Sequence, residues 1–223
     1  MTSRTNSPRK PRRSGSGREH APDPEPAGVW QLPLPPPFAA PLPAPEPVIL
    51  HTIGHGNLPA ETLVGLLRTH GIDTVIDVRS SPYSRYVPHC NRESLASLLA
   101  AYDLAYVWAG DTLGGRPDDE SCYHGGVVKV GQVDYAQVAR RPWFQAGLET
   151  LMTTATGQRA AILCSEEDPR RCHRHKLIAH ALRDRGVRVL HIRRSGELEE
   201  ADSLDCAIPD TGNQQLSLGG FAA

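Results

Sequence analysis

Residues 160–163 read AAIL, and the polar residues CSEE (164–167) follow at once. The same change, from a short apolar run to reactive polar residues, occurs at VILHTI–GHGN (48–57), VI–DVRSSP (75–82) and YVW–AGD (106–111). If the four runs are neighbouring parallel strands, their polar residues emerge together at the carboxyl edge of one sheet, where open α/β sheets bind ligands. The pattern therefore predicts a class of fold and a place for the chemistry.

Helical patterns fill the chain between these runs. One helix is expected around Leu63 with Gly71 just past its end, a second after Asn91, and a third that begins at Pro142. Their expected apolar positions are Leu63, Leu66, Leu67, Leu95, Leu98, Leu99, Tyr102, Phe144, Leu148, Leu151 and Met152. The alternation predicts a single α/β domain over residues 47–195, with a mostly parallel sheet of about five strands and helices on both faces.

Three regions fall outside this pattern. Residues 109–134 hold many glycines and polar groups, which is typical of a long loop or lid. Residues 1–46 are rich in Pro, Arg, Ser and Gly and predict a disordered arm. Residues 196–223 predict a weakly structured tail.

The composition limits the partners and the compartment. A formal net charge of −1 gives the molecule no strong field, so nucleic acid is a weakly supported partner that rests on the basic first twenty residues. No apolar stretch approaches the roughly 20 residues that span a bilayer, and no apolar segment follows the basic start as in a secretory signal. The five cysteines form no compact framework, which favours reduced thiols. We therefore expect a cytoplasmic protein without membrane contact.

The strongest local signal is the segment CSEEDPRRCHR (164–174), which joins a strand to a helix. Asp168 is a good N-cap and Pro169 a good first helical residue. The predicted helix runs to Arg185, with Gly186 as its stop.

The apolar stripe of that helix, followed back by one turn, reaches His173 and Arg174. Both are therefore expected on the core-facing side, close to the carboxyl edge of the sheet. A helix N-terminus favours anions, and a histidine and an arginine add to this preference. The alternative is that Arg174 pairs with Glu166 and ties the helix to its strand.

Cys164 is followed by Arg170 with five residues between, the spacing of the phosphate-binding loop of cysteine phosphatases and some sulfurtransferases. Three carboxylates in this loop would repel phosphate and argue against a phosphatase. A persulfide-carrying nucleophile and a small buried apolar cysteine both remain open for Cys164. Cys164, Cys172, His173 and His55 could converge on a metal ion. Cys172 and His173 are adjacent on the predicted helix, however, and should point apart, and no paired C-x-x-C or H-E-x-x-H spacing is present. The sequence therefore predicts no bound metal, and no cofactor is expected.

Other polar residues follow the remaining strands. His55 lies between two glycines, which allow close approach of a ligand to a general acid or base. Asp77 and Arg79 can share one face of a strand end, either to recognise phosphate or carboxylate together with Ser84 or to brace the loop. The predicted catalytic residues are His55, Glu166 and His173, and the predicted substrate-binding residues are Asp77, Arg79, Ser84, Gly114, Gly115 and Arg174.

Several of these motifs occur together in an order that resembles the domain-of-unknown-function 488 family. The matching residues are Thr52-Ile53-Gly54-His55, Asp77-Val78-Arg79 with Pro82 and Ser84, Leu113-Gly114-Gly115, Leu163-Cys164 with Glu166, Cys172-His173-Arg174, and His191-Ile192. The resemblance runs from about Ile49 to Ile192 and implies one compact α/β domain. It makes the positions to test His55, Asp77, Arg79, Glu166, Cys172, His173 and Arg174. Gly56 departs from the small hydroxyl residue that the family often has there.

The expected function is an enzyme that acts on a small anionic substrate, such as a nucleotide or a phosphorylated metabolite. In this hypothesis Arg79 and Arg174 hold the anion, and His55 or His173 moves a proton. The alternatives are a rhodanese-like sulfurtransferase that uses Cys164 and a non-catalytic module that binds a nucleotide or a protein partner.

Overall fold

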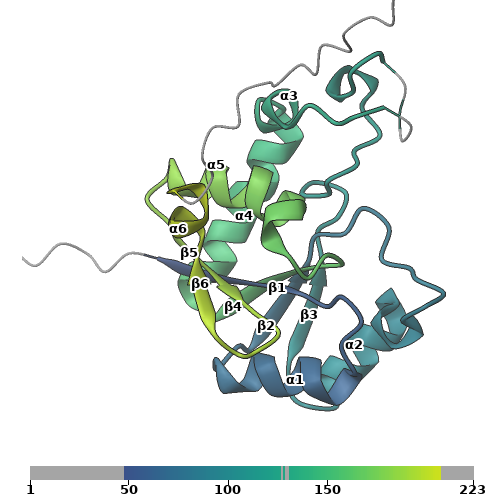
Figure 1. The fold of residues 1–223 in the computed structure, drawn as a ribbon, viewed down its shortest axis with the longest axis vertical. Coiled ribbons are helices and arrows are strands. Elements are labelled where there is room, and N and C mark those ends of the chain that lie inside the picture. Colours follow the sequence, from purple (N-terminus) through teal and green to yellow (C-terminus); the bar gives the residue numbers. More distant parts are fainter. Residues whose placement is uncertain (1–47, 127, 129–130, 207–223) are drawn as a thin grey trace, which may run out of the picture. The chain divides into compact units, whose positions relative to one another are not determined.

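The strands form one sheet in which five of the six run parallel. A computed structural model describes residues 48–126, 128 and 131–206 of the chain, all within one compact unit. The sheet has the order β3-β2-β4-β1-β5-β6 (Figure 1). Its strands are β1 (Ile49–Gly54), β2 (Thr74–Asp77), β3 (Ala105–Trp108), β4 (Ala160–Cys164), β5 (Arg188–Ile192) and β6 (Leu198–Glu200). The α/β prediction is confirmed, and the four sequence runs are four neighbouring parallel strands.

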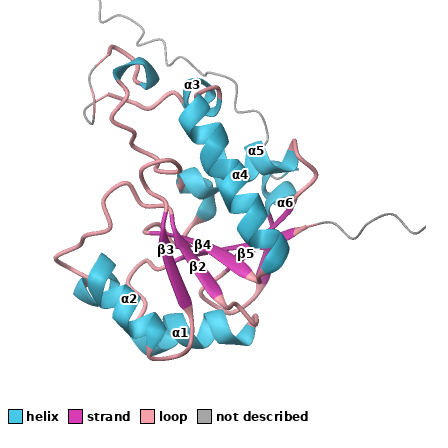
Figure 2. Cartoon of the chain, turned by 180° about the vertical axis from the view of Figure 1, so that it is seen from behind, coloured by secondary structure: helices cyan, strands magenta, loops and turns pink. Residues whose placement is uncertain are grey.

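Helices cover both faces of the sheet, as Figure 2 shows. Helices α1 (Ala60–Thr69) and α2 (Arg92–Ala100) bury Leu63, Leu67, Leu95 and Leu99 against one face. The other face packs against α4 (Pro142–Gly157), α5 (His180–Arg183) and the helical turns before α5. Tyr102 lies beyond the end of α2 and is 39% exposed, so its predicted place on the apolar side is wrong.

The loop predicted between residues 109 and 134 is present in the described residues. It contains one short 3₁₀ turn (Glu120–Cys122) and a single bridge between Tyr123 and Val133, and it leads into α3 (Tyr135–Ala139). The loop begins directly after β3, at the carboxyl edge of the sheet. Its first residues therefore lie beside the end of β2, where Gly110 approaches the Arg79 carbonyl oxygen and Gly114 approaches Ser80.

The C-terminal part differs from the prediction of a weakly structured tail from residue 196. Leu198–Glu200 form β6, which pairs antiparallel with β5, and Ala201–Cys206 form α6. Leu204 and Ala201 are buried, so this segment contributes to the folded unit. The arm predicted over residues 1–46 and the rest of the predicted tail, residues 207–223, lie outside the described residues.

The connection from β4 to α5 also differs from the single long helix that the sequence predicts. Asp168 caps a 3₁₀ turn of only three residues (Pro169–Arg171), and Cys172 then returns to an extended backbone with φ −118° and ψ 145°. A π-helical segment (Arg174–Ala179) follows and continues into α5. Gly186 ends the connection with the expected positive φ of 74°. The break at Cys172 decides the geometry of the site below.

None of the helices in the described part of the chain combines the length and the hydropathy that a transmembrane segment requires.

Candidate active site

A cavity of about 680 Å³ lies where the carboxyl ends of β2, β3 and β4 meet the loop after β3. The strand ends contribute Arg79, Trp108 and Cys164 to its wall. The remaining lining residues are Ser80, Ser81, Gly110, Asp111, Gly115, Arg116, Pro117, Asp118, Tyr135, Ser165, Glu166, Arg171, Cys172 and His173. Acidic and basic side chains both line this cavity, so its wall is polar and carries charges of both signs.

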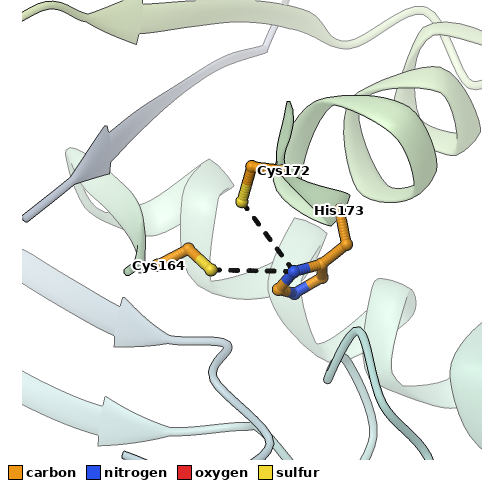
Figure 3. Close-up of side chains that lie close together, drawn as sticks. All are labelled: Cys164, Cys172 and His173. Atoms are coloured by element: carbon orange, nitrogen blue, oxygen red, sulfur yellow. Dashed lines mark hydrogen bonds between the residues drawn. The ribbon is translucent and has the colours of Figure 1, made fainter. Parts of the chain in front are cut away.

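Two thiols and one imidazole converge in the cavity wall. His173 Nδ1 lies 3.6 Å from Cys164 Sγ and 3.9 Å from Cys172 Sγ (Figure 3). All three side chains are buried, and their potential ligand atoms lie within 4.8 Å of one another. We call these three residues the Cys164 cluster.

The expectation that Cys172 and His173 point apart is wrong because it assumed a continuous helix. The extended backbone at Cys172 turns its side chain toward the same point as that of His173. The prediction that His173 and Arg174 face the core is confirmed, since both side chains are buried. The break in the helix therefore brings together two neighbours that a regular helix would separate.

The orientation of the His173 ring is fixed from both sides. Nε2 lies 3.1 Å from the Val78 carbonyl oxygen, so it carries the hydrogen and leaves the lone pair of Nδ1 directed at the sulfurs. Gly115 packs against the ring, and a Cβ at this position would lie 2.6 Å from Cγ of His173. Only glycine thus allows the loop to pass here.

The two thiols of the Cys164 cluster differ in acidity. The pKa of Cys164 is lowered, first by a hydrogen bond from the Cys172 thiol, and further by the charge of Arg174 and the backbone N–H groups of Ser165 and Glu166. The pKa of Cys172 is raised to about 12 by the same hydrogen bond and by burial. Cys164 is therefore the sulfur that carries negative charge more readily.

Asp77, Arg79 and His55 form a buried network. Arg79 donates to both carboxylate oxygens of Asp77, at 2.9 Å from Nε and 2.6 Å from Nη2, and Tyr106 donates to Asp77 at 2.8 Å. Arg79 also donates to the Cys90 carbonyl oxygen at 2.8 Å and to His55 Nε2 at 3.1 Å. The guanidinium lines the cavity but already has partners within the protein, which favours the bracing alternative for this pair.

Arg174 is fully buried and donates three hydrogen bonds inside the protein. Its Nε lies 3.1 Å from Thr52 Oγ1, Nη2 lies 2.6 Å from the Glu167 carbonyl oxygen, and Nη1 donates to the Glu166 carbonyl oxygen. Arg174 therefore binds the backbone carbonyl oxygens of the loop after β4. The alternative drawn from the sequence was an ion pair between Arg174 and the side-chain carboxylate of Glu166.

A chain of hydrogen bonds continues from Arg174 toward the C-terminus. Thr52 Oγ1 lies 2.7 Å from His191 Nδ1, His191 Nε2 lies 3.2 Å from His175 Nδ1, and His175 Nε2 lies 3.2 Å from Asp205 Oδ1. If both histidines carry their hydrogen on Nε2, each of these hydrogen bonds has one donor and one acceptor. The chain ties α6 to the loop that carries Glu166.

The structure separates the predicted site residues into two groups. Arg79, Gly115, Glu166 and His173 line the cavity, together with Cys172 from the family resemblance. Five predicted residues are not among its lining residues: His55, Asp77, Ser84, Gly114 and Arg174. Gly114 packs on Ser80, and the Ser84 hydroxyl accepts from the backbone of Tyr86 and Val87.

Four prominent lining residues, Trp108, Arg116, Tyr135 and Arg171, are not among the predicted site residues. Trp108 is the last residue of β3, and Arg116 directly follows Gly114 and Gly115. A strand end and a glycine-rich turn are the same features that identified other predicted site residues. Tyr135, the first residue of α3, had no such signal, and Arg171 lies in the segment 164–174 but reaches the cavity only through the 3₁₀ turn.

Lowering the pH from 6.5 toward 4 should destabilise the protein through His55. Burial and the charge of Arg79 lower the pKa of His55 from 6.5 to about 4, so the unfolded chain takes up the proton first as the pH falls. The contribution is complete above pH 6.5 and is lost between these values, with an upper limit of roughly 3 kcal/mol. Urea unfolding of wild type and His55→Gln across this range measures it. An equal loss of stability in both proteins would contradict the assignment.

Comparison with known families supplies a context for this geometry. The family model described as "Domain of unknown function DUF488" matches residues 59–182, which is more than half of the chain. No match was found for the chain among curated proteins or among solved structures. The matched residues include β2, β3, β4, the loop over the cavity and all three members of the Cys164 cluster. The chain belongs to the DUF488 family.

Proposed function

We propose that the protein is an enzyme that acts on a small anionic molecule in the cavity, with the Cys164 cluster as its reacting centre. The observation that carries the proposal is the convergence of two thiols and an oriented imidazole in the wall of a cavity at the carboxyl edge of the sheet. Buried groups of this reactivity are costly to gather, and they occur together where chemistry requires them.

The roles differ from those that the sequence predicts. Arg79 and Arg174 are committed to partners inside the protein, so they position the walls of the site. Arg171 is exposed and lines the cavity beside Cys172, which suits a contact with an anionic group of the substrate. Glu166 lines the same cavity, next to the Cys164 cluster, and His173 remains the candidate for proton transfer.

A rhodanese-like sulfurtransferase is the second candidate function. Cys164 lies at a strand end and is followed by the backbone N–H groups of Ser165 and Glu166, as an anion-binding thiol loop requires. The carboxylates of this loop argue against a doubly charged anion close to the sulfur. In the third candidate, a binding module, the cavity would hold a ligand without any turnover.

Substituting Arg171 should weaken anion binding, whereas substituting its neighbour Arg170 should not. Arg170 is also exposed, but it pairs with Glu199 at 3.2 Å and is not among the residues that line the cavity. Thermal shift with inorganic phosphate, adenosine monophosphate and thiosulfate measures binding to wild type, Arg171→Ala and Arg170→Ala. Loss of one charge-assisted hydrogen bond should raise the Kd about tenfold or more in Arg171→Ala. Equal effects of the two substitutions, or no binding of any probe, would count against the proposal.

A further inference from the structure

We infer that the Cys164 cluster binds a zinc ion through Cys164 Sγ, Cys172 Sγ and His173 Nδ1, with one coordination position open to the cavity. The inference rests on the proposed function, because it names the ion that would make this cluster the reacting centre.

The distances fit a tetrahedral ion. Zinc lies about 2.3 Å from thiolate sulfur and about 2.0–2.1 Å from imidazole nitrogen, so a sulfur and a nitrogen on one ion should lie about 3.6 Å apart. The two sulfur–nitrogen distances are 3.6 and 3.9 Å. Both sulfur–nitrogen distances therefore fit a shared ion, and the two sulfurs lie within 4.8 Å of each other.

The surroundings of His173 are those of a metal ligand. Its Nε2 donates to the Val78 carbonyl oxygen, which fixes the tautomer and presents the Nδ1 lone pair to the ion. Gly115 leaves the ring no room to move toward the loop. A ligand that is held in this way needs no reorganisation to bind.

The types of ligand atom favour zinc, and the coordination position that faces the cavity favours a catalytic role for the ion. Two sulfurs and one imidazole nitrogen form a soft set that suits zinc better than magnesium or calcium, which prefer oxygen ligands. Structural zinc sites have four protein ligands, whereas catalytic sites have three and leave a position for water or substrate. All three residues of the Cys164 cluster line the cavity, so the fourth position faces the substrate side.

A zinc-bound water in this place points to hydrolysis as the class of reaction. In such a reaction the oxygen of water replaces the leaving group on the anionic substrate, and the leaving group departs with one of the protons of water. No further co-reactant is required.

A second cluster among the described residues supplies a matched control. His175, His180 and Asp205 also lie within ligand distance of one another, but the Asp205 carboxylate is already paired with Arg183. A zinc ion at the Cys164 cluster should therefore be insensitive to His180→Ala.

Metal analysis of the full-length protein tests the inference. Wild type purified from zinc-supplemented cells should contain about one zinc per chain, and Cys172→Ser and His173→Ala should contain less than about 0.2. His180→Ala and Cys90→Ser should match wild type. Circular dichroism shows whether each variant folds. The zinc content of wild type tests the inference even if a variant fails to fold. Cobalt in place of zinc should add a sulfur-to-cobalt charge-transfer band that Cys172→Ser loses.

The outcomes separate this inference from the proposed function. Wild type without metal, in which iodoacetamide alkylates Cys164, would overturn the zinc site and leave a thiol enzyme. Zinc that persists in every variant of the Cys164 cluster would also overturn it, because the ion would lie elsewhere. Zinc that Cys172→Ser removes, in a protein that binds none of the anionic probes, would support the metal site and count against the proposed substrate.

Discussion

Arg174→Ala is expected to lower the free energy of unfolding by roughly 3–5 kcal/mol, because buried acceptors lose their donors and a large side chain leaves a void. Within the part of the chain that the structure describes, Arg174 has the largest fully buried side chain, and its guanidinium donates to Thr52 and to the carbonyl oxygens of Glu166 and Glu167. Chemical denaturation measures the loss.

Two further substitutions of arginine make this result specific. Arg174→Lys should restore only part of the stability, since an ammonium group cannot reach three acceptors in the planar arrangement of a guanidinium. Arg170→Ala, which removes an exposed arginine four residues away, should change stability by less than about 0.5 kcal/mol. A loss below about 1 kcal/mol in Arg174→Ala, together with weaker anion binding, would return Arg174 to the substrate-holding role that the sequence predicts.

Asp77→Ala should be about as damaging, with an expected loss of roughly 3–5 kcal/mol. The substitution leaves the guanidinium of Arg79 buried without its carboxylate, and that side chain is only 3% exposed. Tyr106 loses its acceptor at the same time. Equilibrium unfolding of the variant provides the measurement.

The double variant Asp77→Ala/Arg79→Leu tests whether the cost comes from the unpaired charge. If it does, the double variant should be less destabilised than the sum of the two single variants by about 1–3 kcal/mol. Additive losses would show that the two side chains stabilise the protein independently, despite their separation of 2.6 Å.

The sheet was predictable because its signal is local. Four of the five parallel strands are short apolar runs that end in polar residues, and the chain alternates these runs with helices. The place of the cavity follows from this topology, as the ends of β2, β3 and β4 demonstrate. A pattern of this kind requires no knowledge of how side chains pack.

The Cys164 cluster was not predictable in the same way. Asp168 and Pro169 are good helix-starting residues, and nothing in the sequence shows that the turn they begin ends after Arg171. The direction of the Cys172 side chain depends on that break. The same limit applies to Arg79 and Arg174, because sequence alone does not distinguish an arginine that meets a ligand from one that meets buried carbonyl or carboxylate oxygens.

The C-terminal boundary of the domain was predicted too early in the chain, at residue 195, for a different reason. Residues 197–202 read ELEEAD, a composition that resembles a solvated tail. As an edge strand, however, β6 needs to pair on one side only, and its glutamates reach Arg188, Arg193 and Arg170. Charged residues are ordinary on such an edge, so their presence was weak evidence against a strand.

The position of β1 in the sheet limits how far this protein can be shortened. β1 lies between β4 and β5, yet both β1 and β5 fall outside residues 59–182, the part that the family model matches. A fragment trimmed to those residues would keep the Cys164 cluster and lose the strand against which β4 is aligned. Recombinant versions of this protein and comparisons across the family therefore need to begin before Ile49 and to extend past Ile192.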